Sequence, residues 1–281
     1  LKFAKKSDSN LSLDAVTGAY PLDIDNDGIL DLAVLRVGEN ILFKGKGNCQ
    51  FENANQQWQF EGGSAWTTAF AAMWEGENTK PSLAFGNYVD RSKPGSPFGT
   101  CHDTDFYRPD GQGRYLANTP LSPGFCSLSL LFTDWNRSGS PSLKIANDRQ
   151  YYRGEGQEQL WKIPLGEKPV RYSAQEGWRR QRIWGMGIAA TDLTGDGKPE
   201  YYVTSMADNK LSTLASQDGK PSFNDIARLR GVTAHRPFVG SSVLPSTGWH
   251  AQFDDVNNDS FSDLYVVKGN VEAMSDFAMQ D

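Results

Sequence analysis

The fold of this chain can be inferred from one acidic window, Asp23-Ile24-Asp25-Asn26-Asp27-Gly28-Ile29-Leu30-Asp31-Leu32. Four carboxylates occupy positions one, three, five and nine, and a glycine follows the third of them. Like charges this close repel one another unless a cation neutralises them. Carboxylates and a backbone carbonyl are oxygen ligands that suit a hard cation, calcium before magnesium. The window therefore predicts a calcium loop, although Asp and Asn also favour turns that hold no metal.

The same pattern recurs along the chain. Full copies begin at Asp192 and Asp255, a weakened copy begins at Asp134, and a copy without its ligands begins at Trp74. Successive windows are spaced by 51, 60, 58 and 63 residues. A repeat of this length corresponds to one supersecondary unit, as in a propeller, a solenoid or an array.

The residues around each window distinguish two kinds of calcium loop. An EF-hand loop needs a bidentate glutamate at position twelve. That position is aliphatic in all four acidic windows, where it is Val34, Ile145, Val203 and Val266. Short β-branched and aromatic segments follow the windows, and short apolar segments precede them, as expected for strands. Each loop is therefore predicted to join two antiparallel strands rather than two helices.

Composition argues against several classes of function. The net charge of −6 and the pI of about 5.2 disfavour a general nucleic-acid binder. No apolar run approaches the length of a membrane helix. The 28 glycines suit many short strands with tight turns, and eight tryptophans supply large side chains to pack between sheets.

Five repeats are predicted, and their regularity favours one all-β domain over residues 1–281. A complete repeat has four antiparallel strands, with the calcium loop between the first and the second strand, which is the blade of a β-propeller. The repeats cover residues 14–60, 61–125, 126–180, 181–232 and 233–281. Residues 1–13 are expected to form a closing strand that pairs with the last blade, because the strand pattern of that blade stops after Val267.

Three cysteines bear on the location of the protein. Cys101 and Cys126 bracket a 24-residue insertion and could form a disulfide, Cys49 stands alone, and the spacing excludes a zinc ribbon. Calcium loops of modest affinity work where calcium is millimolar, which is outside the cytosol. A secreted, periplasmic or cell-surface location is expected. The chain begins at Leu1 without a signal peptide, which favours a processed chain or a fragment.

The acidic windows resemble the FG-GAP/VCBS repeats of integrin-α-type β-propellers. Two further segments are similar to the ASPIC/UnbV (cartilage acidic protein) family: Gly248-Trp249-His250-Ala251-Gln252-Phe253-Asp254-Asp255 leading to Lys268-Gly269-Asn270-Val271, and Asp208-Asn209-Lys210-Leu211. The resemblance implies a calcium-binding propeller outside the cytosol, often with seven blades. The five repeats would then be a five-bladed ring or part of a seven-bladed one.

The resemblance also assigns about three calcium sites by position, with side chains at positions one, three, five and nine and the carbonyl at position seven as ligands. The ligands would be Asp23, Asp25, Asp27, Ile29 and Asp31; Asp192, Thr194, Asp196, Lys198 and Glu200; and Asp255, Asn257, Asp259, Phe261 and Asp263. A fourth, weak site would use Asp134, Asn136 and Ser138, since Ser142 replaces the acid at position nine.

Two classes of function fit these features. The first is a binding or adhesion module for a protein or a glycan, in which calcium is structural and Trp66, Trp184 and Trp249 either line a channel or pack in the core. The alternative is an extracellular, lyase-like enzyme acting on polysaccharides, which needs a base and cations converging in one cleft. Its candidates are His102, His235, His250, Arg179, Arg180 and Arg182. Common hydrolase and nucleotide-binding motifs are absent from the sequence, which favours the binding module.

Overall fold

The computed structural model describes residues 11–94, 96, 99–148, 156–206, 208–215, 218–233 and 247–269. Regular structure in these residues is β-strand, apart from one short 3-10 helix at Ala174–Glu176. No helix among them is long and apolar enough to cross a membrane. The chain divides into two compact units, Leu1–Cys126 and Ser127–Asp281.

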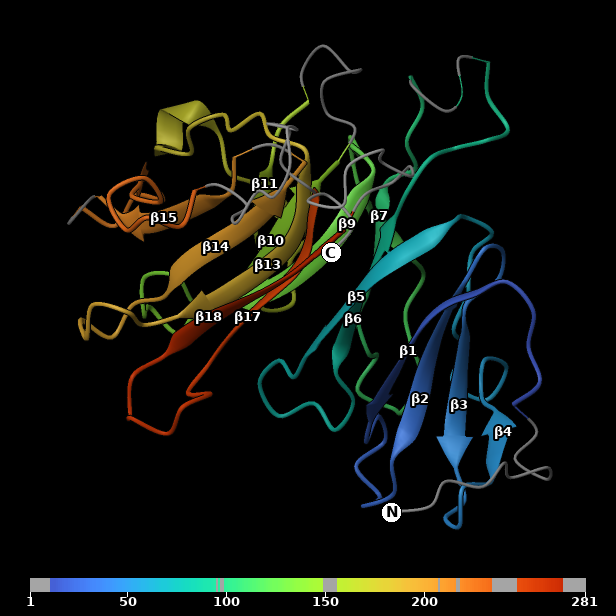
Figure 1. The fold of residues 1–281 in the computed structure, drawn as a ribbon. Helices are drawn as coiled ribbons and strands as arrows, with labels where there is room; N and C mark the ends of the chain where they lie inside the picture. The colour runs from blue at the N-terminus through green and yellow to red at the C-terminus, as the bar shows by residue number, and fades with distance from the viewer. Residues whose placement is uncertain are drawn as a thin grey trace. The chain divides into compact units, whose positions relative to one another are not determined.

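The first unit contains two four-stranded antiparallel sheets, in which strands that are consecutive in the chain are also neighbours (Figure 1). The first sheet consists of β1 (Val16–Leu22), β2 (Asp31–Arg36), β3 (Ile41–Gly45) and β4 (Phe51–Asn53). The second sheet consists of β5 (Thr67–Met73), β6 (Ser82–Asn87), β7 (Thr104–Tyr107) and β8 (Thr119–Leu121).

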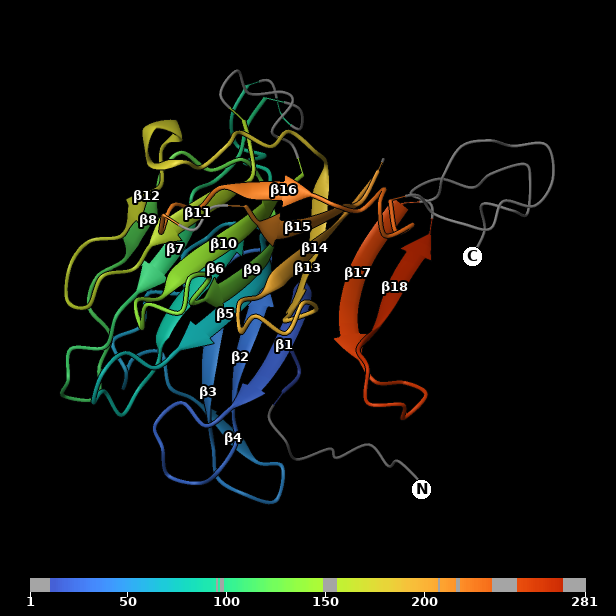
Figure 2. The same cartoon turned by 90° about the vertical axis from the view of Figure 1, so that its left-hand side faces the viewer.

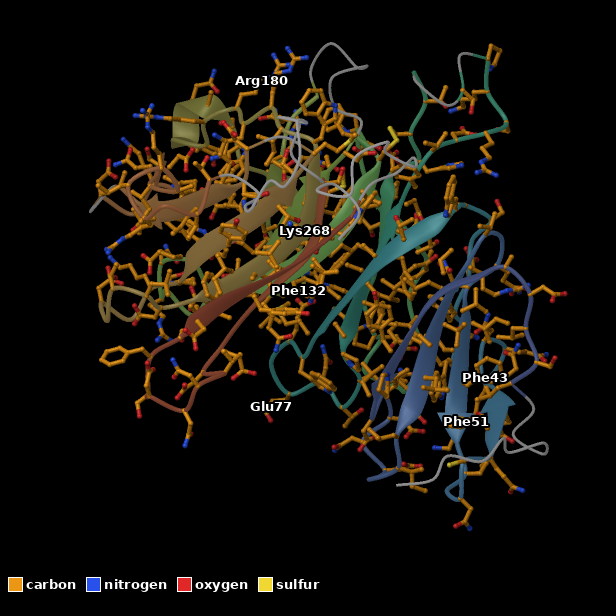
Figure 3. All side chains as sticks on the ribbon, in the orientation of Figure 1. Phe43, Phe51, Glu77, Phe132, Arg180 and Lys268 are labelled. Atoms are coloured by element: carbon orange, nitrogen blue, oxygen red, sulfur yellow. A yellow bond between two sulfur atoms is a disulfide. The ribbon has the colours of Figure 1, made fainter. Side chains whose placement is uncertain are left out.

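Apolar side chains from both sheets share the core of the first unit. Phe60, in the segment that leads out of the first sheet, packs against Phe85 and Tyr107, with ring centroids 5.2 and 4.8 Å away. Aromatic pairs of this kind contribute about 0.5–1.5 kcal/mol beyond the area they bury. A smaller cluster of the first sheet includes Phe43 on β3, with the partly buried Phe51 of β4 packed against it; both residues are labelled in Figure 3. The unit is held by packing between sheets as well as by strand pairing.

The second unit repeats the same arrangement. Its third sheet has β9 (Ser127–Thr133), β10 (Ser142–Asn147), β11 (Gln159–Lys162) and β12 (Val170–Arg171), and its fourth has β13 (Gly185–Thr191), β14 (Glu200–Ser205), β15 (Lys210–Leu214) and β16 (Phe223–Asp225). The fifth sheet pairs β17 (Thr247–Asp254) with β18 (Asp263–Gly269), as Figure 2 shows. The first strands of neighbouring sheets in this unit are in contact, since β13 packs against both β9 and β17.

Aromatic residues also form much of the second unit's core. The ring of Phe223 lies edge-on to Trp135, Trp178 and Tyr201, with centroids 6.2, 6.2 and 5.6 Å away. Trp135 is the second residue of the weakened acidic window and is 1% exposed. The predicted core role of the aromatic residues is confirmed for these side chains.

All five windows join antiparallel strands in one register. The residue just before the window pairs with the ninth residue of the window: Leu22 with Asp31, Met73 with Ser82, Thr133 with Ser142, Thr191 with Glu200, and Asp254 with Asp263. The predicted strand–loop–strand arrangement is confirmed, and the EF-hand is excluded. The expected closing strand falls mostly on residues 1–10, and any further strand of the fifth sheet on residues 270–281, both outside the described residues.

One disulfide links the two cysteines that bracket the insertion. Cys101 and Cys126 are bonded, with their Cα atoms 4.9 Å apart, whereas Cys49 is free and exposed. The bond closes the insertion onto the end of the first unit. Such bonds persist in oxidising compartments, which is consistent with an extracellular location.

Candidate functional site: acidic loops and a polar pocket

The four acidic loops share one backbone template. Positions four and six of each loop have positive φ, the left-handed conformation that glycine and asparagine adopt most readily. These positions are Asn26 and Gly28, Arg137 and Gly139, Gly195 and Gly197, and Asn258 and Ser260. The repeat seen in the sequence is therefore a repeat of conformation as well.

Side-chain oxygens fix this template through backbone N–H groups. In the first loop, Asp23 accepts hydrogen bonds from the N–H groups of Asp27 and Gly28, at 3.1 and 2.9 Å. The carboxylate at position nine accepts one from the N–H at position two: Asp31 from Ile24, Glu200 from Leu193 and Asp263 from Val256, at 2.8, 2.8 and 3.1 Å. Positions one and nine are thus held against the loop backbone in the loops that begin at Asp23, Asp192 and Asp255.

The first loop contains a group of carboxylates that could hold a metal. Asp23, Asp25 and Asp27 each place one oxygen within 4.8 Å of the others. Asp25 Oδ1 is buried without a hydrogen-bond partner. Asp31 is fully buried, and its oxygens accept the N–H groups of Ile24 and Gly45, at 2.8 Å each. Burial raises the pKa of Asp31. Its two hydrogen bonds to backbone N–H groups tie the start of the loop to the end of β3.

A lysine from the third strand already lies among these carboxylates. Lys44 Nζ, on β3, donates to Asp25 and lies 2.6 Å from Asp27 Oδ2. The hydrogen bond from Lys44 holds the pKa of Asp27 below its ordinary value. The charge of this loop is therefore partly neutralised within the chain.

The two later full loops have a different environment. In the fourth sheet, the side chain next to the loop on the third strand is Thr213, which donates to Glu200 Oε1 at 2.8 Å. In the loop at Asp255, Asn257 Nδ2 donates to Asp259 Oδ2 at 3.0 Å. None of the ion pairs between described residues involves a carboxylate of these two loops.

The two incomplete windows are stabilised in other ways. Asp134 keeps the template, since it accepts from the N–H groups of Ser138 and Gly139 at 2.9 and 2.8 Å. The window at Trp74 instead contains Glu75, which is 5% exposed and pairs with Arg108 Nε at 3.0 and 3.1 Å. Ser82 also donates to Glu75. A salt bridge has taken the place of the acidic loop in the second sheet.

A separate polar pocket lies in the first unit, where the segment after β4 meets the segment between β7 and β8. Its volume is about 750 Å³. Asn55 is fixed at its wall, since its Oδ1 accepts from the N–H of Leu42 at 2.8 Å and its Nδ2 donates to the carbonyl of Asn40 at 2.9 Å. The pocket is lined by Glu39, Asn53, Asn55, Gln56, Gln59, Phe60, Glu61, Tyr115 and Ala117. None of these lining residues is a lysine or an arginine.

A second, smaller pocket of about 320 Å³ brings together His102, Asp103 and Asp105 from the insertion. Asp105 accepts hydrogen bonds from Asn87 and Asn118, at 2.7 and 2.5 Å, and burial raises its pKa. Asp103 accepts from the N–H of Gly124 at 2.7 Å. Because both carboxylates are held by neighbouring groups, their main evident role is to order the insertion.

The enzyme candidates named from the sequence do not converge in the described part of the chain. His102 is the only histidine or arginine among them that lines either of these two pockets. Arg180, labelled in Figure 3, is exposed and donates to the carbonyl of Gly156 at 3.1 Å. His250 is exposed on β17, and His235 lies outside the described residues. Trp249 is 40% exposed, and Trp66 stacks under Arg91 at 4.2 Å.

The polar pocket was missed by the sequence analysis. Its signal is the amide-rich segment Asn53-Ala54-Asn55-Gln56-Gln57-Trp58-Gln59, which contains five side-chain amides in seven residues. Such a run is ordinary in a surface turn. Only the packing of Trp58 and Phe60 into the core shows which of these amides face a cavity.

The chain is similar to several solved structures at low sequence identity. No protein-family profile and no curated protein sequence matches the chain. Among solved structures, BBS1N in complex with ARL6DN is similar with a TM-score of 0.47 and 11% identity, over 92% of this chain and 62% of that chain. A lectin of Agrocybe aegerita that recognises non-reducing terminal N-acetylglucosamine is similar with a TM-score of 0.38 and 15% identity, over 91% of this chain and 66% of that chain. The exotype rhamnogalacturonan lyase YesX is similar with a TM-score of 0.32 and 14% identity, over 91% of this chain and 39% of that chain.

This chain spans less than two thirds of each of those three chains. The class of protein is defined by the architecture itself: all-β, with repeated four-stranded antiparallel sheets of consecutive strands, as in propeller blades.

Proposed function

We propose that this protein is a calcium-stabilised, extracellular β-propeller module of the FG-GAP/VCBS type, related to the ASPIC/UnbV family, that binds a neutral glycan. The observation that carries the glycan proposal is the chemistry of the polar pocket. Amides and carboxylates line it beside Phe60 and Tyr115, with no cationic side chain among them. The module acts by binding, and calcium has a structural role.

The lining side chains match the needs of a sugar. Each sugar hydroxyl both donates and accepts a hydrogen bond, and an amide side chain offers both functions in one group. Gln56 and Gln59 are exposed at the pocket, whereas Asn55 is held in place by the backbone of β3. The pocket volume of about 750 Å³ lies in the usual range for small-ligand sites. A mono- or disaccharide unit is therefore the expected occupant.

The charge of the pocket restricts the kind of glycan. Glu39 and Glu61 both line it, and no lysine or arginine offsets them. The negative charges of these glutamates would repel an anionic sugar and so disfavour its binding relative to a neutral one. Hexoses and N-acetylhexosamines fit this pocket better than uronic acids or sulfated sugars.

Calcium is assigned to the loops that begin at Asp192 and Asp255. Their carboxylates at positions one and nine accept loop N–H groups as in the first loop. Unlike Asp23, Asp25 and Asp27, the carboxylates of these loops do not gather three oxygens within 4.8 Å in the described structure. The assignment therefore rests on the shared backbone template and on the fact that none of the ion pairs between described residues involves these carboxylates. An ion at each loop would offset carboxylate repulsion and tie the first strand of a sheet to the second. At a concentration 100 times its dissociation constant, one ion stabilises the folded state by about 2.7 kcal/mol.

The test is binding of neutral and acidic oligosaccharides by the full chain, measured by calorimetry. We expect neutral ligands to bind and acidic ones not to bind. The double variant Gln56→Ala, Gln59→Ala should weaken binding at least tenfold, because each lost hydrogen bond contributes about 1 kcal/mol. Gln57→Ala is the matched control, since Gln57 belongs to the same exposed segment but does not line the pocket.

Three outcomes would count against the glycan proposal: preference for acidic sugars, equal loss of binding in the control, or no binding by any sugar. Shortening of the oligosaccharide during incubation would instead favour the enzymatic alternative. That alternative rests on the pocket that holds His102 beside Asp105.

A further inference from the structure

The third strand of each complete sheet places one residue next to the ninth position of the window. In the third sheet this residue is Lys162, which pairs with Ser142 in the strand register. The equivalent residues are the ones that follow Phe43, Tyr107 and Ser212, which pair with the tenth window position in their own sheets. These residues are Lys44, Arg108 and Thr213. The four sheets thus carry a cation at this position three times and a neutral hydroxyl once.

In the first sheet, this cation enters the acidic loop. Lys44 Nζ donates to Asp25 and lies 2.6 Å from Asp27, and the side chains of Lys44 and Asp25 are each only 17% exposed. Positions three and five of the window are two of the positions predicted to hold a divalent ion in this kind of loop. The ammonium group therefore occupies the space between two of the expected ligands.

In the second sheet, the residue at the same strand position also neutralises a carboxylate of the window. Arg108 pairs with Glu75, the one buried carboxylate of that window. In the third sheet, where the window retains only Asp134, Lys162 is directed to Glu176 instead. In the fourth sheet, where the window retains Asp192, Asp196 and Glu200, the strand position is Thr213, which carries no charge. In the first and second sheets the third-strand cation thus neutralises a carboxylate of its own window, whereas in the fourth sheet, where three carboxylates remain, no cation stands at this position.

We propose that Lys44 is the cation of the first acidic loop and takes the place of a divalent metal there. The carboxylate oxygens of this loop are suitable ligands for a divalent ion. With the ammonium group of Lys44 between them they are not, because the two cations would repel each other in the same small site. The number of calcium ions bound is then set by the third-strand residue as well as by the acidic window. This inference does not depend on the glycan proposal, and it concerns a loop to which that proposal assigns no ion.

The test counts calcium ions bound to the full chain by equilibrium dialysis, in the wild type and three variants. Wild type and Asp27→Asn should bind the same number of ions. Lys44→Met, which keeps the length of the side chain and removes its charge, should bind one ion more than wild type. That additional ion should be lost in the double variant Lys44→Met, Asp27→Asn.

Two results would overturn the inference: loss of one ion in Asp27→Asn alone, or an unchanged number of ions in Lys44→Met. If Lys44→Met folds only when calcium is present, the first loop has become metal-dependent, which supports the inference. If that variant does not fold at all, the comparison of wild type with Asp27→Asn still decides. Wild type without any bound calcium would refute the assignment of calcium to the later loops, while a gain of one ion in Lys44→Met would still support the role of Lys44.

Discussion

Ser260 is the sixth residue of the last acidic loop and has a φ of 71°. The loops that begin at Asp23, Asp134 and Asp192 have glycine at this position, where a Cβ atom is strained. A residue with a side chain pays about 1–2 kcal/mol of strain in this conformation, which glycine avoids. Glycine recovers only part of this difference in stability, because its greater conformational entropy stabilises the unfolded chain. We therefore expect Ser260→Gly to raise the free energy of unfolding by about 0.5–1 kcal/mol, as measured by urea denaturation.

The matched control for Ser260 is the reverse change in the fourth sheet. Gly197 has a φ of 82°, and a Cβ atom there would meet nothing closer than 3.8 Å. Gly197→Ser should therefore destabilise the protein through backbone strain alone, by about 1 kcal/mol. A destabilising Ser260→Gly would show that the loops do not share one backbone template.

At the scale of the element, the second sheet shows how an acidic loop can be replaced. Removing one partner of a buried ion pair typically costs about 3–5 kcal/mol, because the other charge is left without compensation. We expect Glu75→Ala to lower the free energy of unfolding by about 3 kcal/mol in urea denaturation, since Arg108 is only 15% exposed. Glu77→Ala is the control, because Glu77 is an exposed acid of the same window (Figure 3).

The urea measurements on Glu75→Ala and Glu77→Ala can contradict this expectation. If both variants lose less than about 0.5 kcal/mol, which is the range of ordinary surface changes, the Glu75–Arg108 pair does not stabilise the second sheet. Calcium should leave the difference between the two variants unchanged, because Glu75 is already neutralised by Arg108 and this window is not predicted to bind a metal.

The sequence predicted the strands and loops well because their signals are local. The β-branched segments after each window, the glycines at position six and the valine or isoleucine at position twelve all lie within a dozen residues of one another. Lys44 and Arg108 could not be placed in this way, because each reaches an acidic residue 17 to 33 positions earlier through the register of a sheet. The polar pocket likewise depends on Tyr115 meeting the segment after β4, which is a tertiary contact.

At the scale of the whole molecule, each unit is built from repeats that are in contact through the first strands of their sheets. Architectures of this kind gain their stability from repeat interiors and from the interfaces between neighbours. Loops that tie the first strand of a sheet to the second therefore contribute to the unit as a whole. The arrangement of the two units in one ring remains a prediction from the sequence.

Thermal unfolding with EDTA, with millimolar calcium and with magnesium tests the central claim most directly. We predict that calcium raises the Tm well above its value in EDTA, that magnesium does so much less because it requires stricter geometry, and that Asp196→Ala and Asp259→Ala each remove part of the rise. Asp27→Ala should leave the calcium-dependent rise intact, although it destabilises the first loop. An identical Tm in calcium and in EDTA would contradict the account, and the acidic windows would then be turns held by their own hydrogen bonds.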